Sequence, residues 1–353
     1  MSLFYDLILR IQEMERQGKK IVKLNIGETN LPTPVQAVEA AVRSLQTIKS
    51  DYVSPFGLPE LRETLAAREK CSFDNIVVGC GGRETIIGLI LALTKEGDKV
   101  GFPAPFWPAF PIIAKELGRI PVPIHTDYEK GWLFDEIDFS KINFLIICNP
   151  LNPSSIVYPE ELIRKTLDSA EKAGVPVLID GAYHGLAYEK VPNYEKAIRV
   201  KSFSKEFNME GWRLGYAVAP DPVVEKVAKY NQLTLTCVPD FIQRAGIACI
   251  ENEETILNEM KSIWKERQDV ACSLFEEAGF RFVKPQSGMY IFATHEKITD
   301  GTKFCMDLLD QGIAVAPGES FGNYDRYFRM AVNADRRTIQ EVAEKISAYI
   351  SGL

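Results

Sequence analysis

Short apolar runs alternate with helical periods along the chain from about residue 75. Runs rich in β-branched residues predict seven strands, at residues 75–81, 99–104, 120–124, 143–149, 176–180, 197–203 and 213–219. Between most of them the apolar positions recur at helical spacing, as in residues 83–96 and 159–173. This alternation is typical of the α/β class, with a mostly parallel sheet covered by helices. The last two strands have no helix of useful length between them, so we expect them to run antiparallel.

The pattern changes after about residue 245. A long charged helix at 253–278 precedes short strands near 280–283, 289–293, 313–316 and 327–332, and a final helix starts near 337. These elements predict a smaller α+β domain. We therefore expect residues 36–244 to form a large domain with the seven-stranded sheet. Residues 1–35 and 245–353 would form the small domain, with a ligand cleft at the junction.

Composition narrows the class of protein. The chain has 353 residues, of which 46% are hydrophobic and 25% charged, as in ordinary soluble globular proteins. Its formal net charge is -7 and its basic residues are scattered, which argues against nucleic acid and anionic membrane as partners. The first twenty residues are too charged for a signal peptide, and the longest apolar stretch, 86–93, is too short to span a bilayer.

Cysteine and histidine are present but isolated. The seven cysteines form no CxxC pair, which favours reduced thiols and a cytoplasmic location. The three histidines, His125, His184 and His295, lie far apart. We therefore expect neither a metal centre nor a Cys/His nucleophile.

Candidate chemistry gathers just after the carboxyl ends of five predicted strands. The segments concerned are Gly81-Gly82-Arg83, Pro105-Phe106-Trp107, Asn149-Pro150-Leu151-Asn152-Pro153, Asp180-Gly181-Ala182-Tyr183 and Ser202-Phe203-Ser204-Lys205. Ligands of open α/β sheets bind at this edge. An amine, a carboxylate, a Gly-rich turn, an indole and amides together match the needs of one cofactor, pyridoxal 5'-phosphate (PLP).

Two of these residues would carry the chemistry of PLP. Lys205, which we expect on the turn between two strands, would form the Schiff base with the cofactor. Asp180, at the end of an apolar strand, would keep the pyridine nitrogen protonated so that the ring acts as an electron sink.

The remaining residues would hold the cofactor. Backbone N–H groups of Gly81-Gly82-Arg83 at a helix N-terminus suit the phosphate, with added donors from Ser202, Ser204 and Arg213. The other contacts would be Trp107 stacked on the ring, and Asn152 and Tyr183 on its phenolic oxygen.

The chain resembles the class I/II aminotransferases of PLP fold type I, the aspartate-aminotransferase-like group. The lysine signature is Ser202-Phe-Ser-Lys205 followed by Gly211-Trp-Arg213-Leu-Gly-Tyr216. Further matching motifs, in order, are Leu24-Asn-Ile-Gly27-Glu28, Tyr52 with Gly57 and Leu61-Arg62, Pro105-Phe-Trp107-Pro-Ala-Phe110, Asn149-Pro-Leu-Asn152-Pro, Asp180-Gly-Ala-Tyr183, Pro317-Gly-Glu-Ser-Phe-Gly322 and Phe328-Arg329-Met330. The resemblance runs from about residue 20 to the C-terminus.

The resemblance implies further roles. Arg329 would clamp the substrate α-carboxylate, and Gly27 would lie against the substrate, with Asn152 also in contact. Tyr52 would reach the cofactor phosphate of a neighbouring subunit, which implies a homodimer with shared active sites.

The chain departs from the family at three places. Thr29-Asn30 replaces a common Pro-Asp, Ser154-Ser155 replaces a common Thr-Gly, and Arg83 replaces a small hydroxyl residue. The first two bear on loop shape and substrate fit. The third matters least, because the backbone amide at that position serves the phosphate.

The resemblance indicates an aminotransferase that moves the amino group of an L-amino acid, with aspartate favoured, to a 2-oxo acid such as 2-oxoglutarate. Lys205 would also be the general base at Cα. A histidinol-phosphate or aromatic aminotransferase, or a PLP-dependent lyase on the same fold, stays an alternative, and the sequence does not single out the donor. Two purely structural interpretations also stay open, in which Asp180 caps a helix and Arg329 forms a structural salt bridge.

Overall fold

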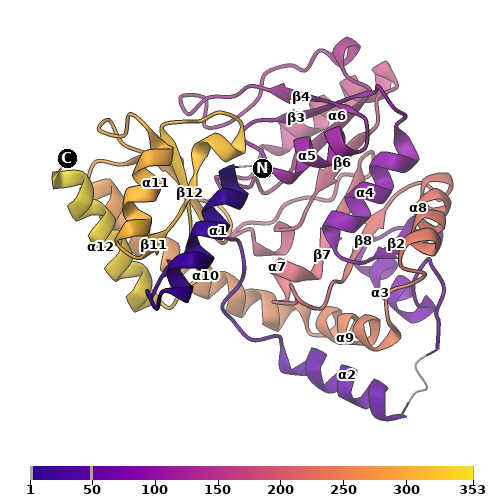
Figure 1. Cartoon of the computed structure of the whole chain (residues 1–353). Coiled ribbons are helices and arrows are strands. Elements are labelled where there is room, and N and C mark those ends of the chain that lie inside the picture. The colour runs from indigo at the N-terminus through magenta and orange to yellow at the C-terminus, as the bar shows by residue number, and fades with distance from the viewer. Residues whose placement is uncertain (1–2, 48–50, 353) are drawn as a thin grey trace.

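The computed structural model describes residues 3–47 and 51–352, and its largest element is a seven-stranded sheet (Figure 1). In spatial order the strands are β2 (Ile76–Gly79), β8 (Gly215–Val218), β7 (Ile198–Ser202), β6 (Val177–Asp180), β5 (Phe144–Cys148), β3 (Lys99–Pro103) and β4 (Ile120–Ile124). Only β8 runs antiparallel, to both β2 and β7. The α/β class and the predicted antiparallel pair are therefore confirmed.

Helices cover this sheet because strands such as β2, β5, β6 and β7 are buried along their length and need apolar cover on both faces. They are α3 (Pro59–Glu69), α4 (Gly82–Leu93), α5 (Ala109–Glu116), α6 (Glu160–Ala173) and α8 (Asp221–Thr234), with the short turns η1 (Phe73–Asn75), η2 (Phe139–Lys141), η3 (His184–Leu186) and α7 (Phe203–Glu206). Helices α2 (Val35–Thr47) and α9 (Asp240–Glu251) pack together at one end of the molecule (Figure 1).

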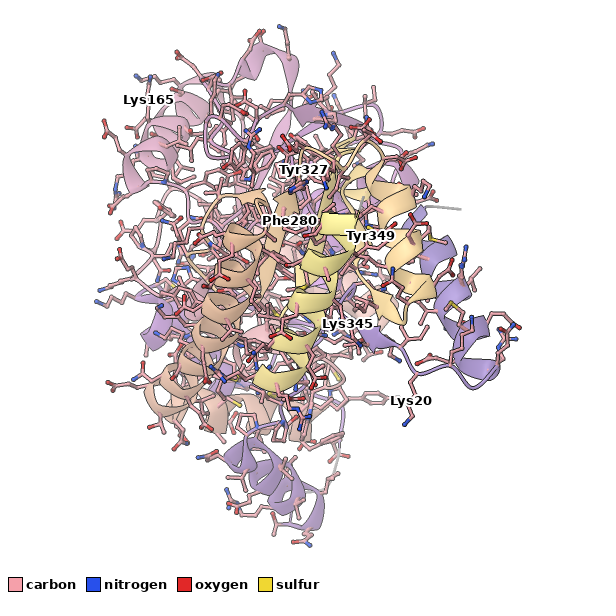
Figure 2. All side chains as sticks on the ribbon, turned by 90° about the vertical axis from the view of Figure 1, so that its left-hand side faces the viewer. Lys20, Lys165, Phe280, Tyr327, Lys345 and Tyr349 are labelled. Carbon is pink, nitrogen blue, oxygen red and sulfur yellow. The ribbon has the colours of Figure 1, made fainter. Side chains whose placement is uncertain are left out.

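A second, smaller unit combines the N-terminal segment with the C-terminal part of the chain. It has a four-stranded sheet in the order β12 (Ala316–Pro317), β13 (Tyr327–Ala331), β10 (Tyr290–Thr294) and β9 (Arg281–Phe282), and a parallel pair of β1 (Val22–Lys23) with β11 (Ile313–Ala314). Its helices are α1 (Leu3–Arg16), α10 (Glu253–Glu277), α11 (Gly301–Asp310), η4 (Gly318–Phe321) and α12 (Arg336–Gly352). Figure 2 shows α10 and α12 side by side on its outer face.

Several local predictions were wrong. The run at 313–316 is not one strand, because β11 pairs with β1 while β12 pairs with β13. Lys205 lies in the one-turn helix α7 rather than on a plain turn. Arg213 precedes its strand, at a left-handed φ of 58°. Helices α8 and α9 had no counterpart in the predicted pattern. The domain boundaries at 35/36 and 244/245 stay a prediction.

Within residues 3–47 and 51–352, no helix combines the length and apolarity needed to cross a membrane. The same residues contain no group of three or more His, Cys, Asp or Glu side chains able to hold a metal ion.

Candidate active site

Lys205 lies at the carboxyl edge of the large sheet, where β7 ends and α7 begins. The Ser202 hydroxyl caps α7 by accepting the N–H of Ser204 at 3.2 Å. The mostly buried Lys205 amine donates a hydrogen bond to the carbonyl of Gly27 and lies 3.4 Å from Oε1 of Glu210. The N-terminal segment therefore reaches the lysine across the sheet edge.

Asp180 ends the neighbouring strand β6, and its side chain is almost fully buried, with the residue 5% exposed. Its carboxylate accepts the N–H of Ala182 at 3.1 Å. Burial raises the pKa of Asp180 to about 6, although that hydrogen bond and the nearby Lys201 ammonium act in the opposite direction. No salt bridge joins Asp180 to a cation within the described part of the chain, so this carboxylate has room for a cationic partner.

A buried charge network lies behind Asp180. Burial lowers the pKa of Lys201 to about 8, against the raising effect of Glu69 and Glu206. Arg68 donates to Glu206 at 2.9 Å, and its pKa is held well above the usual range by surrounding acidic groups. The network fixes α3 to α7, the helical turn that carries the lysine.

The glycine pair forms a tight junction with β8. Gly81 has a φ of 83°, and a Cβ built there would lie 2.4 Å from Nη2 of Arg213. A Cβ on Gly82 would lie 3.4 Å from Cβ of Ser202, and one on Gly215 would lie 2.8 Å from the backbone of both Gly81 and Gly82. Of the predicted phosphate-binding residues, Gly81, Gly82, Ser202 and Arg213 thus meet at the N-terminus of α4.

Trp107 and Arg83 meet beside this loop. The Arg83 guanidinium lies over the indole, 5.0 Å from the ring centroid. Burial, followed by the positive charge of Arg213, lowers the pKa of Arg83. Tyr52 is not in this cluster, since it is 87% exposed on the surface of the single chain.

Arg329 is buried on β13, 3% exposed, and bridges the two units. It donates from Nη1 to Oδ1 of Asn152 at 2.8 Å and from Nη2 to the carbonyl of Asn25 at 2.6 Å. Its Nε has no hydrogen-bond partner, and burial lowers its pKa. Within the described residues no carboxylate forms a salt bridge with Arg329, so the alternative interpretation as a structural ion pair is not supported. The guanidinium is therefore free to bind an anionic ligand.

Tyr290 on β10 links Arg329 to residues predicted to hold the cofactor, and sequence reasoning missed it. Its hydroxyl lies 2.8 Å from that of Tyr183, which accepts from Nδ2 of Asn152 at 3.3 Å. Burial, followed by the effect of Tyr290, holds the pKa of Tyr183 well above its usual value. The Arg329 guanidinium also lies 4.3 Å from the Tyr290 ring centroid.

The departures from the family pattern have local roles. Ser155, where the family often has glycine, adopts a φ of 58°, and its hydroxyl accepts the N–H of Tyr290 at 3.1 Å. Gly27 faces the Tyr290 hydroxyl so closely that any Cβ would collide with it. Sequence reasoning also missed Asn25 and Glu210, whose contacts come from segments far apart in the chain.

The large sheet and the smaller unit together have the fold of the fold type I transferases. Residues 19–346 match the family model described as aminotransferase class I and II, so the chain belongs to that family and is an aminotransferase. An aspartate aminotransferase of Thermococcus kodakarensis is 33% identical over 98% of this chain and 93% of its own length.

Solved structures agree with this assignment. A double mutant of the Thermus thermophilus aspartate aminotransferase has a TM-score of 0.94 at 26% identity, covering 99% of this chain and 96% of its own. A structure of the same enzyme with maleate has a TM-score of 0.93 with the same identity and coverage. The predicted family and fold are confirmed.

Proposed function

We propose that this aminotransferase binds PLP on Lys205 and transfers the amino group of aspartate to a 2-oxo acid such as 2-oxoglutarate. One observation carries the proposal. Among the described residues, a buried carboxylate and a buried guanidinium, Asp180 and Arg329, form no salt bridge, and the Lys205 amine lies at the same sheet edge. Buried unpaired charges are costly unless a ligand supplies the counter-charge.

The residues present fit PLP. The Asp180 carboxylate suits a protonated ring nitrogen, and the Lys205 amine suits the covalent link. The helix N-terminus at Gly81-Gly82-Arg83, with Arg213 and the hydroxyls of Ser202 and Ser204, suits the phosphate dianion. For the ring we assign Trp107 to its face, and Tyr183 and Asn152 to its phenolic oxygen.

When bound, PLP supplies an electron sink for the electrons left at the substrate Cα. Arg329 binds the α-carboxylate through parallel N–H donors and so orients the Cα–H bond. Once the substrate amine has replaced it on the cofactor, the Lys205 amine would remove the Cα proton as a general base and donate it, as an acid, to the cofactor carbon that bears the amino group. Asp180 holds the proton on the ring nitrogen throughout.

Arg83 supports a dicarboxylate substrate such as aspartate. Its exposed side chain places the guanidinium over Trp107, and no ion pair ties it to a carboxylate in the described parts of the chain. A second substrate carboxylate can pair with it while Arg329 holds the first. The similarity to aspartate aminotransferases, one of them solved with maleate, points the same way.

We further propose a homodimer with shared active sites in the cytoplasm. Val35, Val38, Val42 and Leu45 form an exposed apolar stripe along α2, and Val35 and Leu45 are 61% and 56% exposed. In both views α2 projects from one end of the molecule (Figures 1 and 2). Contiguous exposed apolar residues of this kind mark interaction surfaces. The exposed Tyr52 is then available to a partner's phosphate site.

Two measurements test the proposal. Borohydride reduction of the cofactor-loaded enzyme, followed by peptide mapping, should label Lys205, and Lys205→Ala should fold but lose transamination. A panel of amino donors and oxo acids should give the highest kcat/KM with aspartate and 2-oxoglutarate. Labelling at another lysine would overturn the cofactor assignment, and a preference for monocarboxylic donors would overturn the role of Arg83.

A further inference from the structure

The segment from Gly27 to Thr33 lies across the loop that follows Lys205. Besides the contact of Gly27 with the Lys205 amine, Thr33 donates to the carbonyl of Asn208 at 2.9 Å and accepts from Nε1 of Trp212 at 3.1 Å. The segment is therefore attached at one end, Gly27, to Lys205 on α7, and at its other end, Thr33, to the loop that follows α7.

Glu210 makes the central attachment. Its Oε1 accepts the backbone N–H of Thr29 at 2.6 Å, and its Oε2 accepts the Thr29 hydroxyl at 3.1 Å. The Glu210 side chain is 24% exposed, so these hydrogen bonds are partly shielded from water. Hydrogen bonds to an ionised acceptor are about twice as strong as neutral ones.

The residue at position 29 matters for this attachment. The family often has proline there, which has no N–H to donate. Threonine supplies an N–H and a hydroxyl, one for each carboxylate oxygen of Glu210. The neighbouring departure, Asn30, is also attached, since its Oδ1 accepts from Nη1 of Arg267 at 2.6 Å. Thr29 and Asn30 thus attach the N-terminal segment to Glu210 and Arg267, respectively.

We propose that Glu210 is a positioning residue that docks Thr29 and thereby sets the two upstream carbonyls of the active site. The carbonyl of Gly27 contacts the Lys205 amine, and the carbonyl of Asn25 holds Arg329. The segment that carries both carbonyls is held at Leu24 by backbone hydrogen bonds with Ala314 and Ala331, and at Thr29 by Glu210, so the docking contact fixes its second end. This inference rests on the proposed roles of Lys205 and Arg329.

Loss of the docking contact leaves Arg329 and Lys205 present but less well oriented. Glu210→Ala should therefore raise KM for amino acid and oxo acid alike, roughly tenfold, with a smaller fall in kcat. Glu210→Gln keeps one acceptor oxygen for the Thr29 N–H and should lie between wild type and Glu210→Ala. Thr29→Val keeps the N–H but loses the hydroxyl, and should show a partial effect of the same kind.

The experiment measures kcat and KM of the holoenzymes together with hydrogen exchange of residues 25–33. Glu28→Ala is the matched control, because Glu28 is an exposed carboxylate of the same segment. Faster exchange in Glu210→Ala, an intermediate rate in Glu210→Gln and an unchanged rate in Glu28→Ala support the proposal. Non-additive effects of Glu210→Ala and Thr29→Val in the double variant also support it.

Two outcomes overturn the proposal. Unchanged exchange and KM in Glu210→Ala would show that Thr29 docks without help. Equal effects of Glu210→Gln and Glu210→Ala on the pH profile, with unchanged exchange, would assign Glu210 to the charge of Lys205 instead. Either result leaves wild-type transamination and the labelling of Lys205 intact, so it is distinguishable from failure of the proposed function.

Discussion

At the scale of single residues, the site is defined by charges that the folded chain leaves without partners. Asp180 and Arg329 are both buried, and their hydrogen bonds within the described residues are with neutral groups. Such groups destabilise the cofactor-free chain and bind their ligands tightly for the same reason. Stability and function should therefore respond in opposite directions to their substitution.

Asp180→Asn tests this opposition through pH. Burial raises the pKa of Asp180 from 3.8 to about 6, so the folded chain holds that proton more tightly than the unfolded chain. The resulting stability is present below pH 3.8 and is lost as pH rises through 6, a loss of about 3 kcal/mol. The cofactor-free Asp180→Asn variant should therefore have a larger free energy of unfolding than wild type at pH 8 and the same value near pH 3.8. Loaded with cofactor, the variant should lose turnover. Urea titrations at both pH values measure this, and equal stabilities at pH 8 would contradict it.

The Arg329→Lys variant distinguishes a role of Arg329 in substrate binding from a role in stabilising the fold. A lysine keeps the charge but cannot offer two parallel N–H groups, so KM for amino and oxo acids should rise by roughly ten- to a hundredfold. The spectrum of the bound cofactor should stay that of wild type. Arg326→Lys is the control, because Arg326 bonds the backbone carbonyl of Ile298 away from the site. An unchanged KM with a large fall in melting temperature would contradict the clamp.

The sequence predicted those residues that stand in motifs at strand ends. Asp180 ends β6, and the glycine pair and Lys205 come within three residues after β2 and β7, so their meeting at one edge follows from parallel topology. Tyr290, Asn25 and Glu210 could not be found this way, because their contacts exist only once distant segments pack together. A tyrosine inside an apolar strand has the pattern of a core residue.

At the scale of elements, buried parallel strands were predicted well because they form continuous apolar runs. The prediction of a single strand at 313–316 was wrong because of tertiary pairing. Its residues suit a strand, but the partners, β1 for Ile313–Ala314 and β13 for Ala316–Pro317, belong to two different sheets. Pairing of this kind is not encoded in local periodicity.

Gly215→Ala tests the contact between β8 and the glycine loop. A Cβ there meets backbone atoms of Gly81 and Gly82 at 2.8 Å, and backbone cannot move aside as a side chain does. The free energy of unfolding should fall by about 1–3 kcal/mol, and the affinity for PLP should fall with it. Gly211→Ala is the control, since a Cβ at Gly211 meets no atom within 4 Å. Urea unfolding and cofactor titration compare the two, and equal results would contradict the close approach.

At the scale of the whole molecule, the proposed dimer makes each site depend on two chains. Lys205→Ala and Tyr52→Ala should each be strongly impaired alone. Mixed after dissociation, the two variants should regain roughly a quarter of wild-type activity, because half the dimers are hybrids with one intact site.

A substitution on the exposed apolar stripe of α2 tests the proposed interface. Val38→Lys should weaken association of the two chains, whereas Ile112→Lys on α5 should not. Activity assays and sedimentation velocity measure both effects, and an active monomer would contradict the arrangement.

The position of β8 also has a consequence for biosynthesis. Strand β2 lies at the edge of the sheet, and among the described residues its one strand neighbour is β8, which is synthesised much later. During translation β2 and the glycine loop after it must wait, unpaired, until residues 215–218 leave the ribosome. Long-range pairing of this kind slows folding and leaves strand edges open to aggregation. The glycine loop, although encoded early, is therefore expected to be among the last parts of the candidate active site to reach its native form.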